Sequence, residues 1–197
     1  MNLLKKLPKI PQQERSKKKR ALILETSKRI IKDLGPDALT LKNVAERANL
    51  KRPSLYKLFP SVESIIFSLS ELYIKELLNL IKSNFNQVKS QELEYYLKIF
   101  IDVSSIFLNK QRYLSFLFIN LNMNFHSIER SLNHQEHLAI SFSILLNEQN
   151  IKFDREKIMI AVQIIFAVLG HGLRSKGLID SRTINDAKRS ALAVISI

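Results

Sequence analysis

Apolar residues recur every three or four positions along most of the chain, which is the spacing of one face of an α-helix. The first such run places Ile23, Leu24, Ile30 and Ile31 on one side. The pattern of a half-buried strand, in which apolar and polar residues alternate between turn residues, is scarce, and the chain holds only 4 glycines and 5 prolines. The sequence therefore predicts an all-α protein of about nine helices.

The first two helices have recognisable ends. A helix over 16–34 is expected to end at Gly35 and Pro36, because glycine accepts a positive φ at a helix end and proline cannot continue a helix. A second, short helix is expected over 41–48, after Thr40, whose side chain is a good N-cap.

A third helix is expected over 52–59, after a turn in which Asn49 tolerates a left-handed backbone. At 100° per residue, Leu55, Leu58 and Phe59 gather on one side, and the polar and basic residues lie on the other. Two short helices joined by a tight turn, the second with a basic outer face, are the plan of a helix-turn-helix unit. Short helix pairs are also common packing elements, so this pattern alone leaves a purely structural alternative.

The rest of the chain is predicted to be helical. A long helix begins after Ser61, its expected N-cap, and ends near residue 83. The longest apolar run, "IMIAVQIIFAVLG" from Ile158, is interrupted by Gln163 and is too short to span a bilayer, so it is expected to be a buried helix. The further predicted helices are 91–109, 111–123, 127–149, 154–175 and 181–196.

The positive charge is concentrated at one end of the chain. The net charge is +13, but residues 1–60 hold 16 Lys or Arg against 5 Asp or Glu, whereas residues 61–197 hold 15 against 13. The first twenty residues carry eight bases and the single acid Glu14, and two prolines there disfavour helix, which predicts a flexible basic arm over 1–15. This segregation favours a polyanionic partner, with nucleic acid first and an anionic membrane surface second.

Several kinds of chemistry lack the residues they need. The chain has no cysteine, which excludes disulfides, thiolate nucleophiles and cysteine-bound metals and suits a reducing cytoplasm. The basic N-terminus has no apolar core of a signal peptide. His134 and His137 lie at i and i+3 with Glu136 between them, but a third ligand is not apparent, so no metal or other cofactor is expected. Glycine-rich phosphate loops and a Ser/His/Asp set are not evident either, and the sequence does not predict an enzyme.

The segment from residue 21 to 66, "ALILETSKRIIKDLGPDALTLKNVAERANLKRPSLYKLFPSVESII", resembles the DNA-binding domain of the TetR family of bacterial transcriptional regulators. The similarity lies in the "IL" of the first helix, the glycine that ends it, "T…VAERA" and "SLYKLFPS". Four positions depart from the family pattern. They are Asn49 for glycine, Lys51 for serine, Leu58 for histidine and Val62 for lysine. The last three remove an expected cap or expected phosphate contacts.

The resemblance implies a division into an arm (1–15), a helix-turn-helix domain (16–60) and an effector-binding and dimerisation domain (61–197). It further implies a homodimer that places the 52–59 helix of each subunit in the major groove of a partly palindromic operator. Such a dimer most often represses transcription, and binding of a small molecule releases it from the DNA. The residues expected to reach base edges are Arg52, Pro53, Ser54, Tyr56 and Lys57. Thr40, Lys42 and Lys51 are expected to contact phosphates. The bases expected to follow the DNA backbone or enter the minor groove are Arg15, Lys17, Lys18, Lys19 and Arg20 of the arm and first helix.

Two sites are expected in the C-terminal domain. Aromatic residues interleaved with asparagines in "YLSFLFINLNMNFH" suit the lining of a largely apolar effector pocket, although the same mixture is typical of ordinary core with asparagines at its surface. The expected pocket residues are Phe100, Phe116, Asn120, Met123 and Gln163. The last two helices are expected to form the dimer interface through Ile158, Val162, Ile165, Leu169, Leu173, Ala191 and Ile195.

The competing hypothesis is a basic helical protein that binds DNA without sequence preference or lies on an anionic membrane. The first would show a uniform, salt-driven affinity for any duplex, and the second would bind liposomes. An operator-specific regulator would instead protect one site near its own gene.

Overall fold

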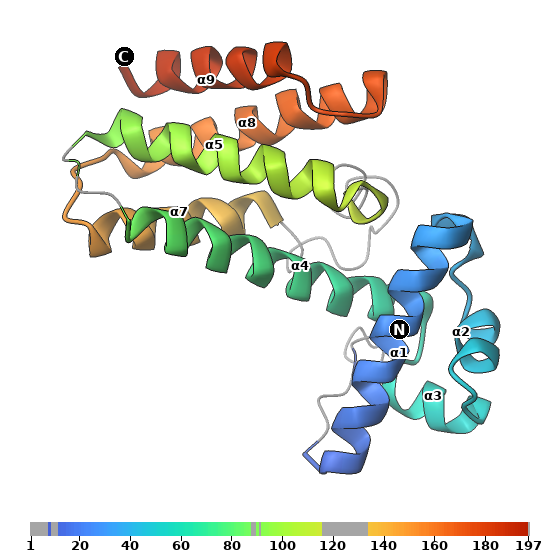
Figure 1. Ribbon diagram of the computed structural model, residues 1–197. Helices are drawn as coiled ribbons and strands as arrows, with labels where there is room; N and C mark the ends of the chain where they lie inside the picture. The colour runs from blue at the N-terminus through green and yellow to red at the C-terminus, as the bar shows by residue number, and fades with distance from the viewer. Residues whose placement is uncertain (1–7, 9–11, 88–89, 91, 116–133, 197) are drawn as a thin grey trace. The chain divides into compact units, whose positions relative to one another are not determined.

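The computed structural model of the protein describes residues 8, 12–87, 90, 92–115 and 134–196, and every regular element in these residues is helical (Figure 1). The prediction of an all-helical protein is therefore confirmed. Of the predicted helix over 111–123, the described part is only a short 3₁₀ turn; residues 116–133 lie outside the described residues. The elements are α1 (Glu14–Leu34), η2 (Pro36–Ala38), α2 (Leu41–Arg47), α3 (Arg52–Leu58), α4 (Val62–Phe85), α5 (Leu93–Lys110), η3 (Arg112–Leu114), α7 (His134–Glu148), α8 (Arg155–Lys176) and α9 (Ser181–Ser196).

The described residues divide into two compact units, and the division falls within α4 between Leu72 and Tyr73. This position is further along the chain than the domain boundary predicted at residue 60. The first half of α4 belongs with the N-terminal unit because Ile65 and Leu69 are fully buried and Ser68 bonds to a residue of α1. One continuous helix therefore contributes to both units.

The helix ends of the N-terminal unit follow the local signals in the sequence. Gly35 ends α1 with φ 86°, and its N–H donates to the carbonyl of Ile31. The Thr40 hydroxyl oxygen accepts from the backbone N–H of Asn43 at 3.1 Å and caps α2. Asn49 adopts φ 50° in the turn before α3. These three predictions are confirmed, and together they determine where α2 and α3 begin and end.

The core of the N-terminal unit is made by one face of each helix. The side chains with no exposed surface come from all four helices: Ile23, Ile30, Val44, Leu55, Ile65 and Leu69, together with Phe59 directly after α3. Leu34, which shares the helical spacing of α1, is 53% exposed at the last residue of the helix, although Ile31 in the same turn is buried.

The C-terminal unit has an aromatic core. The ring centres of Phe100 on α5 and Phe142 on α7 are 4.5 Å apart, and Phe100 also lies edge-on to Phe166 on α8 at 6.2 Å. Phe85 and Tyr96 stack edge to face at 4.8 Å. Such pairs stabilise a core by about 0.5–1.5 kcal/mol each beyond the burial of their area.

Helices α8 and α9 cross closely. Small residues line the inner side of α9, where Thr183, Ala187 and Ala191 are buried. Opposite them, Gly172 of α8 is so near that a Cβ atom built on it would lie 2.8 Å from Cγ2 of Thr183. At Gly172 the missing side chain thus allows close approach within the chain, between α8 and α9.

The connection between α8 and α9 is held by polar contacts. Asn109 of α5 pairs with both backbone groups of Ile179 at 2.8 Å. The side chain of Asp180 accepts from the backbone N–H and the hydroxyl of Thr183 and from the ammonium of Lys176. The hydrogen bonds from Lys176 and then from Thr183 hold the pKa of Asp180 far below its usual value.

Helix α8 is long and apolar enough by length and composition to cross a bilayer, alone among the described helices, with a mean hydropathy of 1.6 over its most apolar window. The expectation that this segment is too short considered only the apolar run from Ile158, and the length of the whole helix corrects it. In the structure 44% of that window is buried in the bundle.

Candidate nucleic-acid interface

Helix α3 has a buried side and an exposed side. Leu55, Leu58 and Phe59, which lies just beyond the last turn of α3, are 0%, 8% and 0% exposed. Arg52, Pro53, Tyr56 and Lys57 are exposed and Ser54 is half-buried. Proline is tolerated at 53 because the first turn has no intrahelical partner for its missing N–H. The division predicted for residues 52–59 is confirmed, including the burial of Leu58 where the family pattern has histidine.

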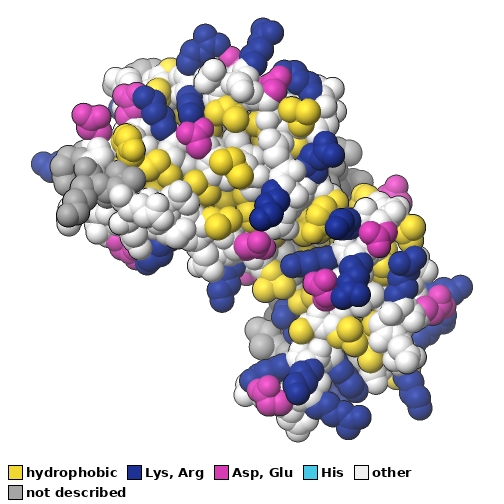
Figure 2. Space-filling view, viewed as in Figure 1, with side chains coloured by type: hydrophobic (Ala, Val, Ile, Leu, Met, Phe, Trp, Pro, Cys, Tyr) yellow, Lys and Arg dark blue, Asp and Glu magenta, His cyan; other side chains and the backbone are white. Residues whose placement is uncertain are grey.

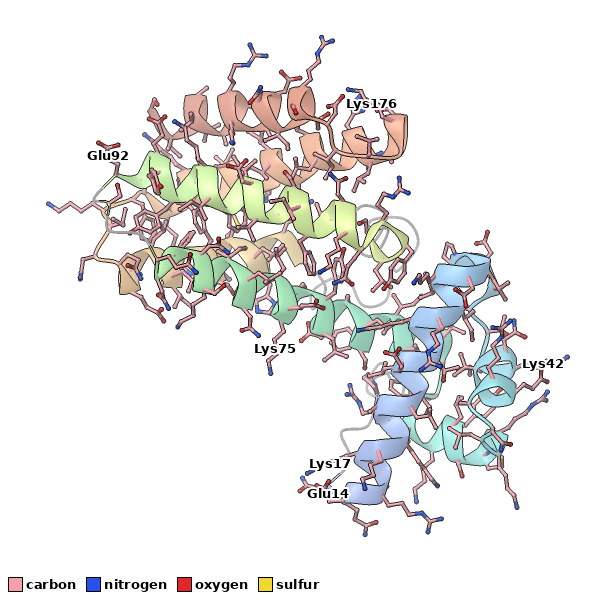
Figure 3. The ribbon with its side chains drawn as sticks, viewed as in Figure 1. Glu14, Lys17, Lys42, Lys75, Glu92 and Lys176 are labelled. Carbon is pink, nitrogen blue, oxygen red and sulfur yellow. The ribbon has the colours of Figure 1, made fainter. Side chains whose placement is uncertain are left out.

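The outer face of α2 adds more charge. Lys42, Glu46 and Arg47 are exposed, and Figure 3 shows Lys42 extending away from its helix. Asn43 of the same helix is half-buried, and its side-chain amide donates to the carbonyl of Ala38 at 2.8 Å. Thr40 is exposed, and although its oxygen caps α2, its O–H proton is still available to a phosphate oxygen.

A carboxylate, Glu46, lies among these bases, and it is not among the residues predicted to contact DNA. The Oε1 atom of Glu46 is 3.8 Å from Nη2 of Arg52, and both side chains are 58% exposed. The signal was present in the sequence, since Glu46 is the only acid between Asp37 and Glu63.

Helix α1 begins earlier than predicted. It starts at Glu14, so Arg15 belongs to the first turn of a helix and not to the predicted arm over 1–15. The ammonium of Lys17 pairs with Glu14 at 2.7 Å, as Figure 3 shows at the start of α1, while Arg15 is exposed. Figure 2 shows Lys and Arg side chains crowded over the N-terminal unit. Lys18 is exposed and Lys19 half-buried on the same helix.

Arg20 lies inside the unit and not on its basic face. Its Nη2 donates to the hydroxyl of Ser68 on α4 at 2.9 Å, and its guanidinium carbon lies 5.7 Å from the centre of the Phe59 ring. Burial lowers the pKa of Arg20. The expectation that Arg20 follows the DNA backbone is therefore wrong, because its guanidinium connects α1 to α4 and to the end of α3.

The expected effector pocket is described only in part. Phe100 is buried in the aromatic core, whereas Gln163 is exposed on α8 and does not point into the bundle. Phe116, Asn120 and Met123 lie outside the described residues. Among the residues that the structure describes, no three His, Cys, Asp or Glu side chains gather as a metal site.

The residues expected at the dimer interface lie mostly in the core of the chain. Ile158, Val162, Ile165, Leu169 and Ala191 have no exposed surface, and Leu173 and Ile195 are half-buried. For the five fully buried residues the assignment is corrected, because their apolar spacing is that of faces packed inside the chain, whereas for Leu173 and Ile195 it stays a prediction. The exposed side of α8 carries a different apolar row, with Ile160 48% exposed, Ala167 exposed, and Ile164 and Val168 half-buried.

Comparisons with known proteins agree with this geometry. Residues 23–69 match the family model of bacterial regulatory proteins, tetR family. Three similar solved structures are a TetR-family transcriptional regulator from Streptomyces coelicolor, the multidrug binding protein EbrR complexed with imidazole, and the fatty acid degradation regulator FadR from Bacillus halodurans. Their identities to this chain are 16%, 13% and 16%, with TM-scores of 0.67, 0.71 and 0.65. The alignments cover 92%, 91% and 90% of this chain and 97%, 96% and 94% of those chains. No curated protein matches the chain in sequence.

Proposed function

We propose that the chain, whose residues 23–69 match the family model of tetR regulatory proteins, is a ligand-responsive DNA-binding repressor that binds its operator as a homodimer. The observation that carries the proposal is the two-sided α3, whose apolar residues fix it in the unit while Arg52, Pro53, Tyr56 and Lys57 stay exposed. An exposed face of this size on a helix fits the major groove of DNA. Genomic DNA as the partner implies the bacterial cytoplasm.

The outer residues differ in what they offer to DNA. Arg52 and Lys57 can donate to the O6 and N7 atoms of guanine, and Pro53 offers apolar contact to a thymine methyl group. Ser54 and Tyr56 supply hydroxyl groups that both donate and accept. Thr40, Lys42 and Lys51 flank this face and suit phosphate oxygens, which position the helix without reading sequence.

We assign the dimer interface to the exposed row of α8, namely Ile160, Ile164, Ala167 and Val168. These residues follow each other at helical spacing, so they form one continuous apolar strip on a helix whose opposite side is already buried. A two-fold dimer buries the same strip of both subunits and brings two copies of α3 to half-sites about one turn of DNA apart, roughly 34 Å.

The proposed effector is a small, largely apolar molecule bound in the C-terminal unit. The proposal is supported by the apolar, aromatic interior of this unit, where Phe100, Phe142 and Phe166 are buried together, so that a ligand entering it would meet apolar side chains. Two of the similar structures bear names that refer to multidrug binding and fatty acid degradation, and these concern those proteins. They suit an apolar effector here without identifying it.

The test is footprinting of the purified protein on the intergenic DNA that flanks its own gene. We expect one protected, partly palindromic site that survives competition by unrelated duplex at moderate salt. Uniform protection that disappears with rising salt would instead identify a non-specific DNA binder. Binding to anionic liposomes with no protected site would support the membrane alternative. A transcription assay on the protected promoter then distinguishes repression from activation.

A further inference from the structure

The helix-turn-helix face carries a single carboxylate among bases. Glu46 lies in the last turn of α2 and is exposed. Its charged neighbours in sequence, all exposed, are Lys42, Arg47, Lys51, Arg52 and Lys57. A negative charge on a surface that meets phosphates opposes binding, because affinity for DNA grows with the number of phosphates neutralised. The position of Glu46 therefore needs a reason other than general affinity.

The contact between Glu46 and Arg52 contributes too little to folding stability to explain why a carboxylate lies at this position. Both side chains are 58% exposed and their charged atoms are 3.8 Å apart. Exposed ion pairs of this kind contribute only about 0–1 kcal/mol to folding. What the contact does show is proximity: the guanidinium of Arg52, the first residue of α3, lies beside the Glu46 carboxylate. Base-reading residues of helix-turn-helix proteins lie at that end of the recognition helix.

We propose that Glu46 and Arg52 act as one reading group for a G·C base pair in each half-site, an inference that rests on the proposed function. Arg52 donates to the O6 and N7 atoms of the guanine, and a carboxylate oxygen of Glu46 accepts from the N4 amine of the paired cytosine. These edges lie side by side in the major groove, as the two side chains do on the protein. Glu46 is thus a specificity-determining residue, although its charge is opposite to that of the bases around it.

The carboxylate also excludes competitors. At the position of the cytosine amine, thymine presents a carbonyl and guanine presents two acceptors, so a carboxylate accepts no hydrogen bond from them and is repelled. Glu46 therefore lowers the affinity for wrong sequences more than for the right one. Specificity obtained in this way weakens binding to random DNA, which is measurable.

The experiment compares the wild-type chain with Glu46→Gln, Arg52→Gln and the double variant, using Asp33→Asn as control. Asp33 is an exposed carboxylate in the last turn of α1, so its substitution removes the same charge elsewhere in the unit. The preferred site is first selected from random duplexes. Anisotropy titrations then give the Kd for that site, for each G·C-to-A·T replacement in its half-site, and for an unrelated duplex.

We expect one G·C pair whose replacement weakens wild-type binding by about tenfold or more. Glu46→Gln should reduce that penalty several-fold and tighten binding to the unrelated duplex, while Asp33→Asn leaves the penalty unchanged. Arg52→Gln should abolish the same penalty, and the double variant should lose nothing further at that pair. Circular dichroism should show intact folding of each variant, since the pair is exposed.

Two results would overturn the inference. If Glu46→Gln strengthens binding to every duplex by the same factor and keeps all base penalties, Glu46 is only a solvated charge. If Arg52→Gln removes the G·C penalty while Glu46→Gln leaves it unchanged, the cytosine is not read by Glu46. A wild-type protein with no preferred sequence is a different result, because it refutes the proposed function itself.

Discussion

The substitution Gly172→Ala tests how closely α8 and α9 cross. The added Cβ would lie 2.8 Å from Cγ2, 3.0 Å from Oγ1 and 3.4 Å from Cβ of Thr183. Carbon atoms in contact prefer about 3.5–4.0 Å, so either the helices separate or Thr183 moves. Thr183 is not free to rotate, because its hydroxyl donates to the carboxylate of Asp180 at 2.6 Å and its Cβ is branched.

Two opposing contributions decide how much Gly172→Ala changes the free energy of unfolding. Alanine is better than glycine inside a helix by about 1 kcal/mol. Overpacking by one methyl group in a close-packed site costs about 1–3 kcal/mol. The difference is a net destabilisation of about 0–2 kcal/mol in the wild-type chain. With Thr183→Ala present, only the 3.4 Å contact remains, which is an ordinary van der Waals distance, so the same substitution should stabilise by up to about 1 kcal/mol.

The assay is urea unfolding, monitored by circular dichroism, of four proteins that form a double-mutant cycle. They are the wild-type chain, Gly172→Ala, Thr183→Ala and the variant with both substitutions. Thr183→Ala alone should cost about 0.5–1.5 kcal/mol, because its hydrogen bond to Asp180 is lost, and the cycle removes that cost from the comparison. Comparing Arg174→Gly with Arg174→Ala, at an exposed site in α8, measures the propensity term directly. If Gly172→Ala had the same effect with and without Thr183→Ala, the close crossing would not exist.

Three further predictions concern DNA, assembly and pH. Lys57→Ala should weaken binding to the selected operator by about 1–3 kcal/mol and relax the preference at one base position. Lys75→Ala, on the exposed side of α4, should change neither the affinity nor the preference. Equal losses of affinity on operator and random DNA would contradict a base-reading role for Lys57. Ile160→Lys should convert the dimer into a monomer, as measured by sedimentation at micromolar concentration. Ile144→Lys, at an exposed site of α7, should leave the dimer intact. A wild-type chain that is already monomeric would refute the interface. Stability should fall as the pH drops below the ordinary carboxyl pKa toward the lowered pKa of Asp180, since protonation is favoured in the unfolded chain, and Asp180→Asn should flatten this part of the urea-stability profile against pH.

The elements of the N-terminal unit were predictable because their ends depend on local chemistry. Gly35, Thr40 and Asn49 each satisfy a backbone requirement that involves only nearby residues, and the apolar spacing of α3 places Leu55 and Leu58 inside without knowledge of the rest of the fold. For the same reason the exposed face of α3 could be assigned from the sequence.

The predictions that failed concern contacts between distant parts of the chain. In the sequence Arg20 is one more base in a basic run. Only the structure shows that its guanidinium donates a hydrogen bond to Ser68, which is 48 residues away in the chain. Likewise, an apolar row on α8 does not reveal whether it faces its own bundle or a second subunit, and the row that includes Ile158 and Val162 faces the bundle. Periodicity identifies a buried face but not the partner that buries it.

The two sides of α3 have a practical consequence. Because Leu55, Leu58 and Phe59 fix the helix through contacts that DNA does not touch, the outer residues can be exchanged with little cost to folding. Leu58 in place of the family's histidine strengthens this separation, since it adds one more apolar residue to the fixed side. Transplanting the outer residues of another regulator onto this helix should redirect the protein to a foreign promoter while its C-terminal unit stays unchanged, which would make the chain a scaffold for new genetic circuits.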